Sequence, residues 1–226
     1  MERFEDEFVT WHHKTPVGVK IDEVFGMDSK TGKVWLELAK QIYCEQGEPN
    51  YREIGHFENG APFLWGSQSR ISISHTDHFL VVASLPKTPE SDLSKFSPRT
   101  AMGVDAERLE RQQVIKIRER FLNKEELEKI PEEDLKKNII AWTAKEALYK
   151  AAMTPGLDFR EAISLEELPE IDENPEKRKT ETLGKAFIRF PEESGIETQE
   201  MLLYSYESYG CCVTIALSPK CAKFGR

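Results

Sequence analysis

Two stretches of the sequence carry β-forming runs on both sides of a short polar break, and this pattern constrains the fold more than any other feature. In the first, Arg70–His75 alternates apolar and polar residues, Thr76–His78 breaks the pattern, and Phe79–Ala83 resumes in β-forming residues. In the second, residues 201–206 and 211–217 flank a short turn. Because two such runs around a turn are typical of a β-hairpin, we expect antiparallel sheet in both halves of the chain.

A helix is predicted ahead of each hairpin. Residues 31–46 carry apolar residues at helical spacing and are followed by Gly47, which favours a helix end, and a second helix is expected around 137–153. This repeated order predicts an α+β fold with a pseudo-twofold duplication. The two similar subdomains, residues 1–98 and 99–226, would each have a helix packed on an antiparallel sheet.

Other segments give fewer constraints. Residues 155–182 are rich in Glu, Pro and Gly and predict a surface excursion, after which Ala186–Phe190 offers another strand. The charge run Asn123–Lys129 mixes both signs, which is typical of a solvated helix or loop. We assign no function to these segments.

Composition excludes several classes of protein. A net charge of −9 opposes extended binding to nucleic acid, which needs a basic surface. The acidic first residues lack the apolar core of a signal peptide and no apolar run is as long as a membrane span, so a soluble, cytoplasmic protein is expected. The four cysteines form no CxxC pair and have no histidines at zinc spacing, and we expect reduced thiols.

Asp105 and Glu107 lie two residues apart in a segment that begins as an apolar strand. Side chains at this spacing leave the same face of a strand, so the two carboxylates can bind one hard cation together. Few oxygen ligands suit Mg²⁺, which keeps several waters and completes its shell with substrate phosphate. On its own, such a pair is more often part of a solvated strand.

A predicted helix over residues 140–151 places Glu146 and Lys150 one turn apart beside an apolar face. Taken alone, this is an ordinary surface pair of the Glu-to-Lys type, which stabilises a helix by only about 0.3–0.5 kcal/mol. Ser74 and His75 end the first strand of the first hairpin. A histidine there often caps or packs, but with the Ser74 hydroxyl and the amides of the turn it can also donate hydrogen bonds to a phosphate.

Three segments together resemble the 4'-phosphopantetheinyl transferase superfamily, in particular its two-subdomain, Sfp-type holo-carrier-protein synthases. They are Ser-Ile-Ser-His at 72–75, Gly-Val-Asp-Ala-Glu at 103–107 and Trp-Thr-Ala-Lys-Glu-Ala-Leu-Tyr-Lys at 142–150. The order and approximate spacing match the family over about residues 60–153, and the joint pattern is far more specific than any one part. The resemblance implies transfer of the phosphopantetheine arm of coenzyme A to a serine of an apo acyl- or peptidyl-carrier protein.

The resemblance also implies roles for individual residues. Asp105, Glu107 and Glu146 would hold Mg²⁺ at the pyrophosphate of coenzyme A. Glu146 would accept the proton of the carrier serine, directly or through a metal-bound water, and Lys150 would assist the leaving 3',5'-ADP. Asp105, Glu146 and Lys150 would thus be the catalytic residues. The substrate phosphates would be bound by four residues: Ser74, His75, Lys145 and Lys150.

Some positions depart from the family pattern. Gly60-Ala61-Pro62 stands where Gly-Lys-Pro is common, and the usual arginine of the first helix is not evident, with Lys40 its nearest substitute. The residues that contact the 3'-phosphate of coenzyme A are therefore open. Ala106 replaces a frequent Ile or Val, and it should point away from the metal because its neighbours face it.

Two other functions remain possible from the sequence. A magnesium nuclease would use similar residues, although such sites typically place Glu and Lys two apart on a strand. A degenerate family member would only bind coenzyme A or carrier proteins. Retention of all candidate metal ligands and of Lys150 opposes that reading.

A docking surface for an acidic carrier protein is expected after the metal strand. Residues 112–122 place Val114, Ile117 and Phe121 at helical spacing and leave a basic side for solvent. Basic residues are frequent between 108 and 120: Arg108, Arg111, Lys116, Arg118 and Arg120. Lys116, Arg120 and their neighbours are the predicted contacts, although an ordinary solvated amphipathic helix has the same pattern.

Overall fold

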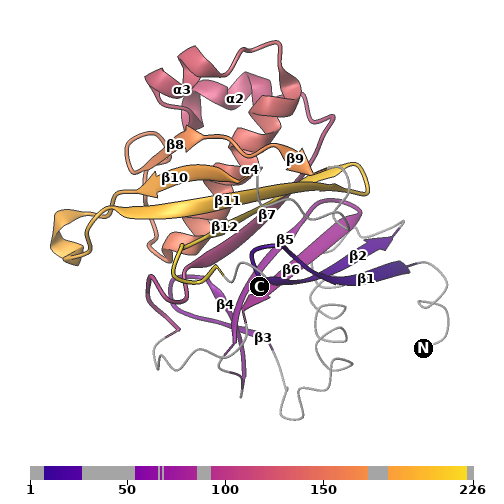
Figure 1. The fold of residues 1–226 in the computed structure, drawn as a ribbon, viewed down its shortest axis with the longest axis vertical. Helices are drawn as coiled ribbons and strands as arrows, with labels where there is room; N and C mark the ends of the chain where they lie inside the picture. The colour runs from indigo at the N-terminus through magenta and orange to yellow at the C-terminus, as the bar shows by residue number, and fades with distance from the viewer. Residues whose placement is uncertain are drawn as a thin grey trace.

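The structure is a computed structural model, and its two larger sheets, which are mostly antiparallel, pack against each other (Figure 1). The residues that it describes are 8–26, 54–65, 67, 69–85, 93–172 and 183–222, without the side chains of 8–13. The predicted first helix, residues 31–46, lies outside this part, as does Lys40.

The first sheet has the strand order β1-β2-β6-β5, and each neighbouring pair is antiparallel. Its strands are β1 (Phe8–Lys14), β2 (Lys20–Gly26), β5 (Arg70–His75) and β6 (Phe79–Leu85). The hairpin predicted from the first alternating stretch is confirmed as β5 and β6, whereas β1 and β2 were not predicted. A small separate hairpin pairs β3 (Ile54–His56) with β4 (Pro62–Leu64).

The second sheet has the order β7-β12-β11-β10-β8, with β9 paired to β11. Its strands are β7 (Met102–Arg108), β8 (Ile163–Glu167), β9 (Ile171–Asp172), β10 (Gly184–Ile188), β11 (Gln199–Ser208) and β12 (Cys211–Leu217). The second predicted hairpin is confirmed as β11 and β12, and the predicted strand at 186–190 is β10. The prediction that 155–182 is only a surface excursion is wrong at 163–167, because β8 pairs with β10 and buries Ile163 and Leu165.

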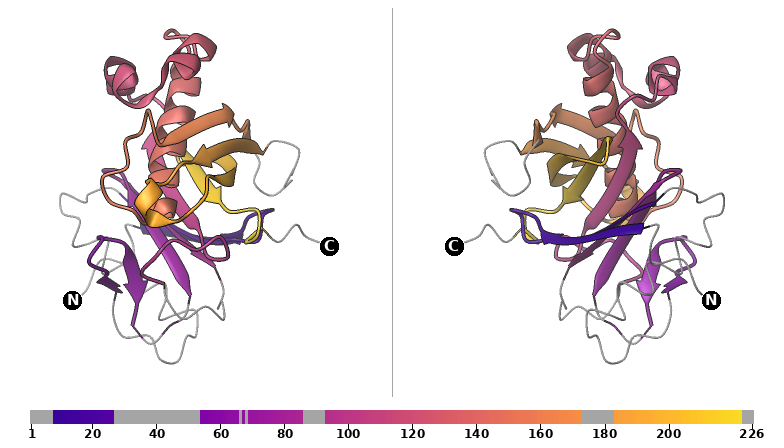
Figure 2. Two further views of the ribbon diagram at one scale, coloured as in Figure 1. Left: turned by 90° about the vertical axis from the view of Figure 1, so that its left-hand side faces the viewer. Right: turned by 90° about the vertical axis from the view of Figure 1, so that its right-hand side faces the viewer.

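Three helices follow β7 along the chain: α2 (Gln113–Phe121), α3 (Lys124–Lys129) and α4 (Leu135–Ala152), and a short 3₁₀ turn, η2 (Glu192–Ser194), precedes β11. The helix predicted around 137–153 is α4, which packs on one face of the second sheet against β7 and β12 (Figure 2). No helix in the described part of the chain is long and apolar enough to cross a membrane. The α+β fold class is confirmed, while the duplication and the division at residue 98 stay predictions.

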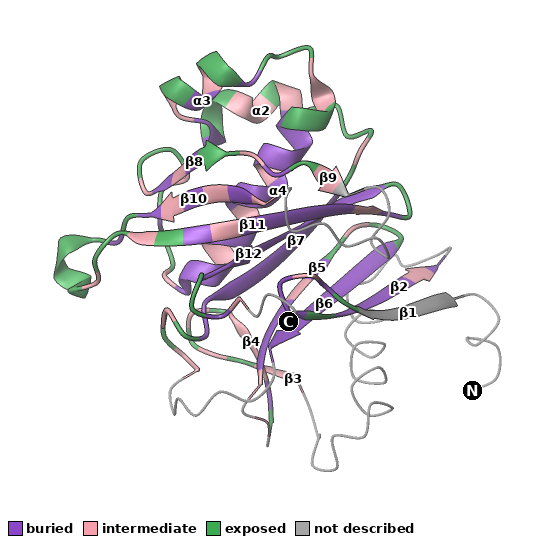
Figure 3. Cartoon of the chain, viewed as in Figure 1, coloured by how far each residue is buried: buried purple, intermediate pink, exposed green. Residues whose placement is uncertain are grey.

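The facing sides of the two sheets are largely buried (Figure 3). Apolar residues of both sheets form one core between them. Met102, Val104 and Ala106 of β7 pack there, with Phe79 and Val81 of β6 among their partners. Ala106 therefore points away from the carboxylates of β7, as predicted. Buried hydrogen bonds also join the sheets, and at one of these places Glu23 of β2 accepts from Tyr206 Oη at 2.6 Å and from Ser208 Oγ at 2.8 Å, both on β11.

Three cysteines belong to the described residues, Cys211, Cys212 and Cys221, and each is a buried thiol that forms no disulfide bond there. Burial raises the pKa of Cys211 and of Cys212 to about 11, which keeps both thiols protonated at neutral pH. The prediction of reduced thiols is confirmed for these three, and Cys44 lies outside the described residues.

Gly103 sets the distance between β7 and α4. A Cβ atom at this position would lie 2.0 Å from the carbonyl oxygen of Ala147 and 2.7 Å from the amide nitrogen of Ala151. Both atoms belong to the backbone of α4, so no side-chain rotation could relieve the contact. Glycine therefore lets the helix backbone rest directly on the strand at the turn that also carries Glu146 and Lys150.

Gly103→Ala should lower the free energy of unfolding by about 3 kcal/mol, because the added methyl group forces α4 away from β7. Gly156→Ala is the control: its φ of +79° disfavours a side chain, but no atom lies within 4 Å, and a cost of about 1 kcal/mol is expected. Urea unfolding of both variants measures the difference. Equal losses would show that the close approach at Gly103 does not limit stability.

Candidate active site

Asp105 lies on the face of β7 that α4 covers, and it is the centre of a polar cluster. Its Oδ1 atom accepts hydrogen bonds from Ser74 Oγ at 2.8 Å and from Lys150 Nζ at 2.7 Å. Only 7% of the residue is exposed. Three segments therefore meet at one carboxylate: β5, β7 and α4.

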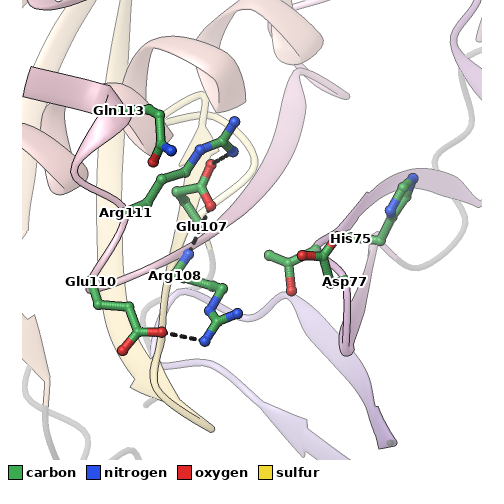
Figure 4. Close-up of a pocket in the computed structure, with 8 residues that line it drawn as sticks. His75, Asp77, Glu107, Arg108, Glu110, Arg111 and Gln113 are labelled. Atoms are coloured by element: carbon green, nitrogen blue, oxygen red, sulfur yellow. Dashed lines mark hydrogen bonds and ion pairs between the residues drawn. The ribbon is translucent and has the colours of Figure 1, made fainter. Parts of the chain in front are cut away.

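Glu107 follows on the same face of β7 and is also buried. It accepts a hydrogen bond from the amide of Arg108 at 2.9 Å and forms an ion pair with Arg111 (Figure 4). Burial raises the pKa of Glu107, while the amide of Arg108 and the charge of Arg111 act in the opposite direction. Glu107 is thus a partly desolvated carboxylate beside the first one.

Glu146 and Lys150 lie one turn apart on α4, on the side that faces these carboxylates. The pKa of Glu146 is raised to about 6, first by burial and then by the negative charge of Asp105, with a smaller contribution from Glu107. Lys150 lowers it in part. Because the charges of Asp105 and Glu107 act on Glu146, the structure brings the three predicted carboxylates into one electrostatic cluster.

Ser74 and His75 come to this cluster from the other sheet. Ser74 Oγ, besides donating to Asp105, accepts a hydrogen bond from the amide of Ala106 at 3.2 Å. Ser72 Oγ accepts in the same way from the amide of Val104 at 3.0 Å. These bonds fix the end of β5 beside β7, and they leave His75 exposed at the end of its strand.

A cavity of about 560 Å³ opens beside this cluster. Figure 4 shows His75 and Asp77 on one side of it, and Glu107, Arg108 and Arg111 on the other. Arg108 forms an ion pair with Glu110, which also lines the cavity. The cavity is polar, carries both signs of charge and reaches the edge of the carboxylate cluster.

The three carboxylates have the oxygen ligands that a hard cation prefers, but the two on β7 contact basic side chains in this structure. Among the described residues, no three His, Cys, Asp or Glu side chains are placed to hold one metal ion together. Asp105 and Glu107 instead contact the cations Lys150 and Arg111. The donor set is all oxygen, partly desolvated and mutually repulsive, and these properties suit Mg²⁺. Asp105, Glu107 and Glu146 thus have the donor chemistry for such an ion, although in this structure they are not placed to hold it together.

The prediction that Lys145 binds substrate phosphates is not supported by its position. Its side chain is fully buried, and Nζ forms an ion pair with Glu126 at 2.8 Å. Nζ also donates hydrogen bonds to the carbonyl oxygens of Phe159 at 2.8 Å and Ile163 at 2.6 Å. Successive helix residues point about 100° apart, so Lys145 faces the core while Glu146 faces the cleft.

Glu126 has a structural role, which the mixed charges around it in the sequence did not indicate. It caps α3 by accepting a hydrogen bond from the amide of Asn123 at 2.8 Å, and it accepts another from the amide of Leu165 in β8 at 2.6 Å. With Lys145, it joins α3, β8 and α4. We had assigned no function to the charge run that contains Glu126, because mixed charges are usually solvated. The capping pattern of Asn123 with Glu126 was the available signal.

The 4'-phosphopantetheinyl transferase superfamily profile matches residues 101–214, half of the chain. The chain belongs to this superfamily. A search of curated proteins finds no significant match. The assignment supports a transferase that moves a phosphopantetheine group, with coenzyme A and a carrier protein as its general partners.

The matched residues include Asp105, Glu107, Glu146 and Lys150. Ser74 and His75 lie before the match, and it is the structure that connects them to it. The bond from Ser74 to Asp105 places the end of β5 beside β7, which lies within the matched residues. The candidate site of this phosphopantetheinyl transferase therefore spans both sheets.

Lys145→Met should destabilise the protein by about 3–5 kcal/mol, because it leaves Glu126 buried without its cation. The combined Lys145→Met, Glu126→Gln variant should lose less than the sum of the single changes, since the two side chains interact directly. Lys137→Met, an exposed position on the same helix, should change stability by less than about 0.5 kcal/mol. Urea unfolding gives these values. If Lys145→Met keeps full stability but binds coenzyme A more weakly, Lys145 is a substrate-binding residue and the structural role is wrong.

Proposed function

We propose that this protein transfers the 4'-phosphopantetheine group of coenzyme A to a serine of an apo carrier protein, in a Mg²⁺-dependent reaction that releases 3',5'-ADP. The observation that carries the proposal is the cluster around Asp105, in which carboxylates, Lys150 and Ser74 meet beside an open cavity. The superfamily assignment supports the same general chemistry.

Asp105, Glu107 and Glu146 would hold the Mg²⁺. Bound there, the ion would supply positive charge to the pyrophosphate and stabilise the charge that develops on it during transfer. It would also remove the repulsion among the three carboxylates, which contributes to the raised pKa of Glu146.

The protein's own groups account for the proton and the leaving group. The carrier serine oxygen attacks the phosphorus that bears pantetheine, and the bond from that phosphorus to the bridging oxygen of the pyrophosphate breaks. The serine proton passes to the carboxylate of Glu146, which faces the other two carboxylates from α4 and is ionised at neutral pH. Lys150 Nζ donates to Asp105 Oδ1 and to the carbonyl oxygens of Val104 and Ile73 in this structure, and it would exchange one of these bonds for one to the departing 3',5'-ADP.

The remaining phosphate contacts come from β5. The exposed imidazole of His75 lines the cavity and can donate to a pyrophosphate oxygen. The Ser74 hydroxyl donates to Asp105 in this structure, and it would have to exchange that bond to do the same. Their part is to orient the coenzyme so that the attacked phosphorus faces the incoming serine. The nuclease reading is not retained, because the superfamily assignment and the helical spacing of Glu146 and Lys150 both oppose it.

Asp105→Ala and Glu107→Ala should each reduce transfer by about 10²–10³-fold, the loss typical when a group that stabilises transition-state charge is removed. Excess chelator should have the same effect on the unaltered protein. The measurement is intact mass of several apo carrier proteins after incubation with coenzyme A and Mg²⁺. Glu166→Ala, an exposed carboxylate of β8, is the control and should retain activity. Full turnover in excess chelator would contradict the metal assignment.

Docking of the carrier protein is proposed at α2. Val114 and Phe121 are buried, and Lys116 and Arg120 are exposed, as the helical pattern predicted. Arg118 does not belong to this surface, because its guanidinium donates hydrogen bonds to Asn138 Oδ1 at 3.1 Å and to the carbonyl of Ile130. Arg108 at the end of β7 and Arg111 ahead of α2 form ion pairs with Glu110 and Glu107, so fewer basic groups are available around the helix than the sequence suggested.

Lys116→Glu combined with Arg120→Glu should slow association with an acidic carrier protein, since charges at the rim of an interface act mainly on the association rate. The carrier concentration needed for half-maximal rate should rise about tenfold at low salt, and less at high salt. Lys124→Glu with Lys129→Glu makes the same charge change on the neighbouring α3 and should have a smaller effect. Kinetics at two salt concentrations test this. An equal response of both double variants would remove α2 as the docking surface.

A further inference from the structure

Three hydroxyl groups are buried where α4 packs on the second sheet. They belong to Thr143 of α4, Ser205 of β11 and Thr214 of β12, and all three residues are fully buried. The positions on either side of Thr214 on the same face of β12, Cys212 and Ala216, belong to the apolar core that α4 helps to form. Burying a hydroxyl group is unfavourable unless it is hydrogen-bonded, so the three groups need partners within this core.

The three hydroxyl groups form one chain of hydrogen bonds. Thr214 Oγ1 lies 2.7 Å from Thr143 Oγ1 and 2.7 Å from Ser205 Oγ. Thr143 Oγ1 also lies 3.1 Å from the carbonyl oxygens of Ile139 and Ile140, which can only accept a hydrogen. Because a hydroxyl has one hydrogen to donate, Thr143 accepts from Thr214, and Thr214 accepts from Ser205. The chain of donors thus runs from β11 through β12 into α4.

The hydroxyl chain lies in the same row of the sheet as Asp105. Ser205 pairs directly with Thr214, and Thr214 pairs directly with Asp105 of β7. Directly paired residues of antiparallel strands have neighbouring side chains on one face of the sheet. All three side chains are therefore on the face that α4 covers, and the chain reaches α4 one strand away from the central carboxylate of the candidate site.

Thr143 and Lys150 hold α4 to the sheet on either side of Glu146. Residues 143, 146 and 150 lie along one side of the helix, because residues three, four and seven apart are neighbours on its surface. At one end Thr143 is bonded to Thr214 of β12, and at the other Lys150 Nζ is bonded to Asp105 Oδ1 at 2.7 Å. Glu146 lies between these two contacts.

The two contacts differ in how far the reaction would disturb them. In the proposed mechanism Lys150 exchanges one of its bonds for a bond to the departing 3',5'-ADP, and 30% of its side chain is exposed. Thr143 is fully buried and cannot reach a substrate. Its bond to Thr214 would therefore keep α4 in place on the sheet while Lys150 changes its partner.

We propose that Thr143, bonded to Thr214 and through it to Ser205, is a positioning residue that holds Glu146 at the reacting centre; this inference rests on the proposed function. Thr143 touches no substrate and acts through the backbone of α4. A displacement of about 1 Å at a reacting group can reduce the rate about a hundredfold. Apolar side chains of the same shape could fill this space with little loss of stability, but they would not fix the direction in which α4 faces β12.

The test replaces the whole hydroxyl chain by apolar groups, in the triple variant Thr143→Val, Thr214→Val, Ser205→Ala. This variant should unfold at nearly the same urea concentration as the unaltered protein, because no buried hydroxyl is left without a partner. Its kcat for transfer to a carrier protein should fall about tenfold to a hundredfold, while its KM for coenzyme A should change by less than about twofold. A purely structural role would change the urea midpoint instead of kcat.

Two further variants serve as controls. Thr143→Ser keeps the hydroxyl group, and its kcat should stay within about twofold of that of the unaltered protein. Thr15→Val removes another buried hydroxyl, which donates to the carbonyl of Val19 at 3.2 Å and accepts from the amide of Val19 at 3.1 Å, in the turn between β1 and β2. It should lower the urea midpoint and leave kcat unchanged, because this turn has no contact with α4 among these bonds.

A folded triple variant with the kcat of the unaltered protein would overturn the proposal. So would a Thr143→Ser variant as slow as the triple variant, because the hydroxyl group would then not be the cause. If the triple variant does not fold, Thr143→Val alone decides by the same criterion. Failure of the unaltered protein to modify any carrier would refute the proposed function and this inference with it, whereas transfer at an unchanged kcat in the triple variant refutes this inference alone.

Discussion

The contact between α4 and β7 at Gly103 is the constraint on which the site depends. At this position the helix backbone lies where a Cβ atom would have to be, so strand and helix are as close as a glycine allows. That closeness lets Lys150 reach Asp105 Oδ1 and lets the charge of Asp105 act on Glu146. A larger residue would separate the two elements and with them the carboxylates. The chemistry of the cleft therefore depends on a residue with no side chain.

Two lysines of α4 have different roles because their side chains point in different directions. Lys145 points into the core, where Glu126 and two carbonyl oxygens satisfy its ammonium group. Lys150 points to the cleft and remains partly exposed beside Asp105. A fully paired buried lysine contributes to a unique arrangement of α3, β8 and α4, while a partly exposed lysine can exchange its partner for a substrate phosphate. One face of α4 therefore stabilises the fold, and another face carries the residues of the candidate site.

The sequence predicted those helices and strands whose apolar residues recur at a regular spacing within the element itself. The alternation in β5, the paired runs of β11 and β12 and the helical spacing of α4 all belong to this class. The strand β8 was missed because it has only five residues, of which three are polar. Its strand conformation depends on pairing with β10. The direction of Lys145 was missed for a related reason. Its partner, Glu126, comes from another helix, and no periodicity within α4 reveals it.

The same limit applies to the site. The sequence placed Asp105 and Glu107 on one face and Glu146 one turn from Lys150, but it could not show that Arg111 and Lys150 already neutralise two of these carboxylates. Nor could it show where an acidic protein concentrates positive charge. Two cavities that share His75 differ in this respect: the one beside the carboxylates has mixed charge, and the other, between the β3–β4 hairpin, β5 and the end of α4, has no carboxylate among its described lining residues. Such a difference in charge depends on which segments meet at each cavity, and no local pattern in the sequence contains that information.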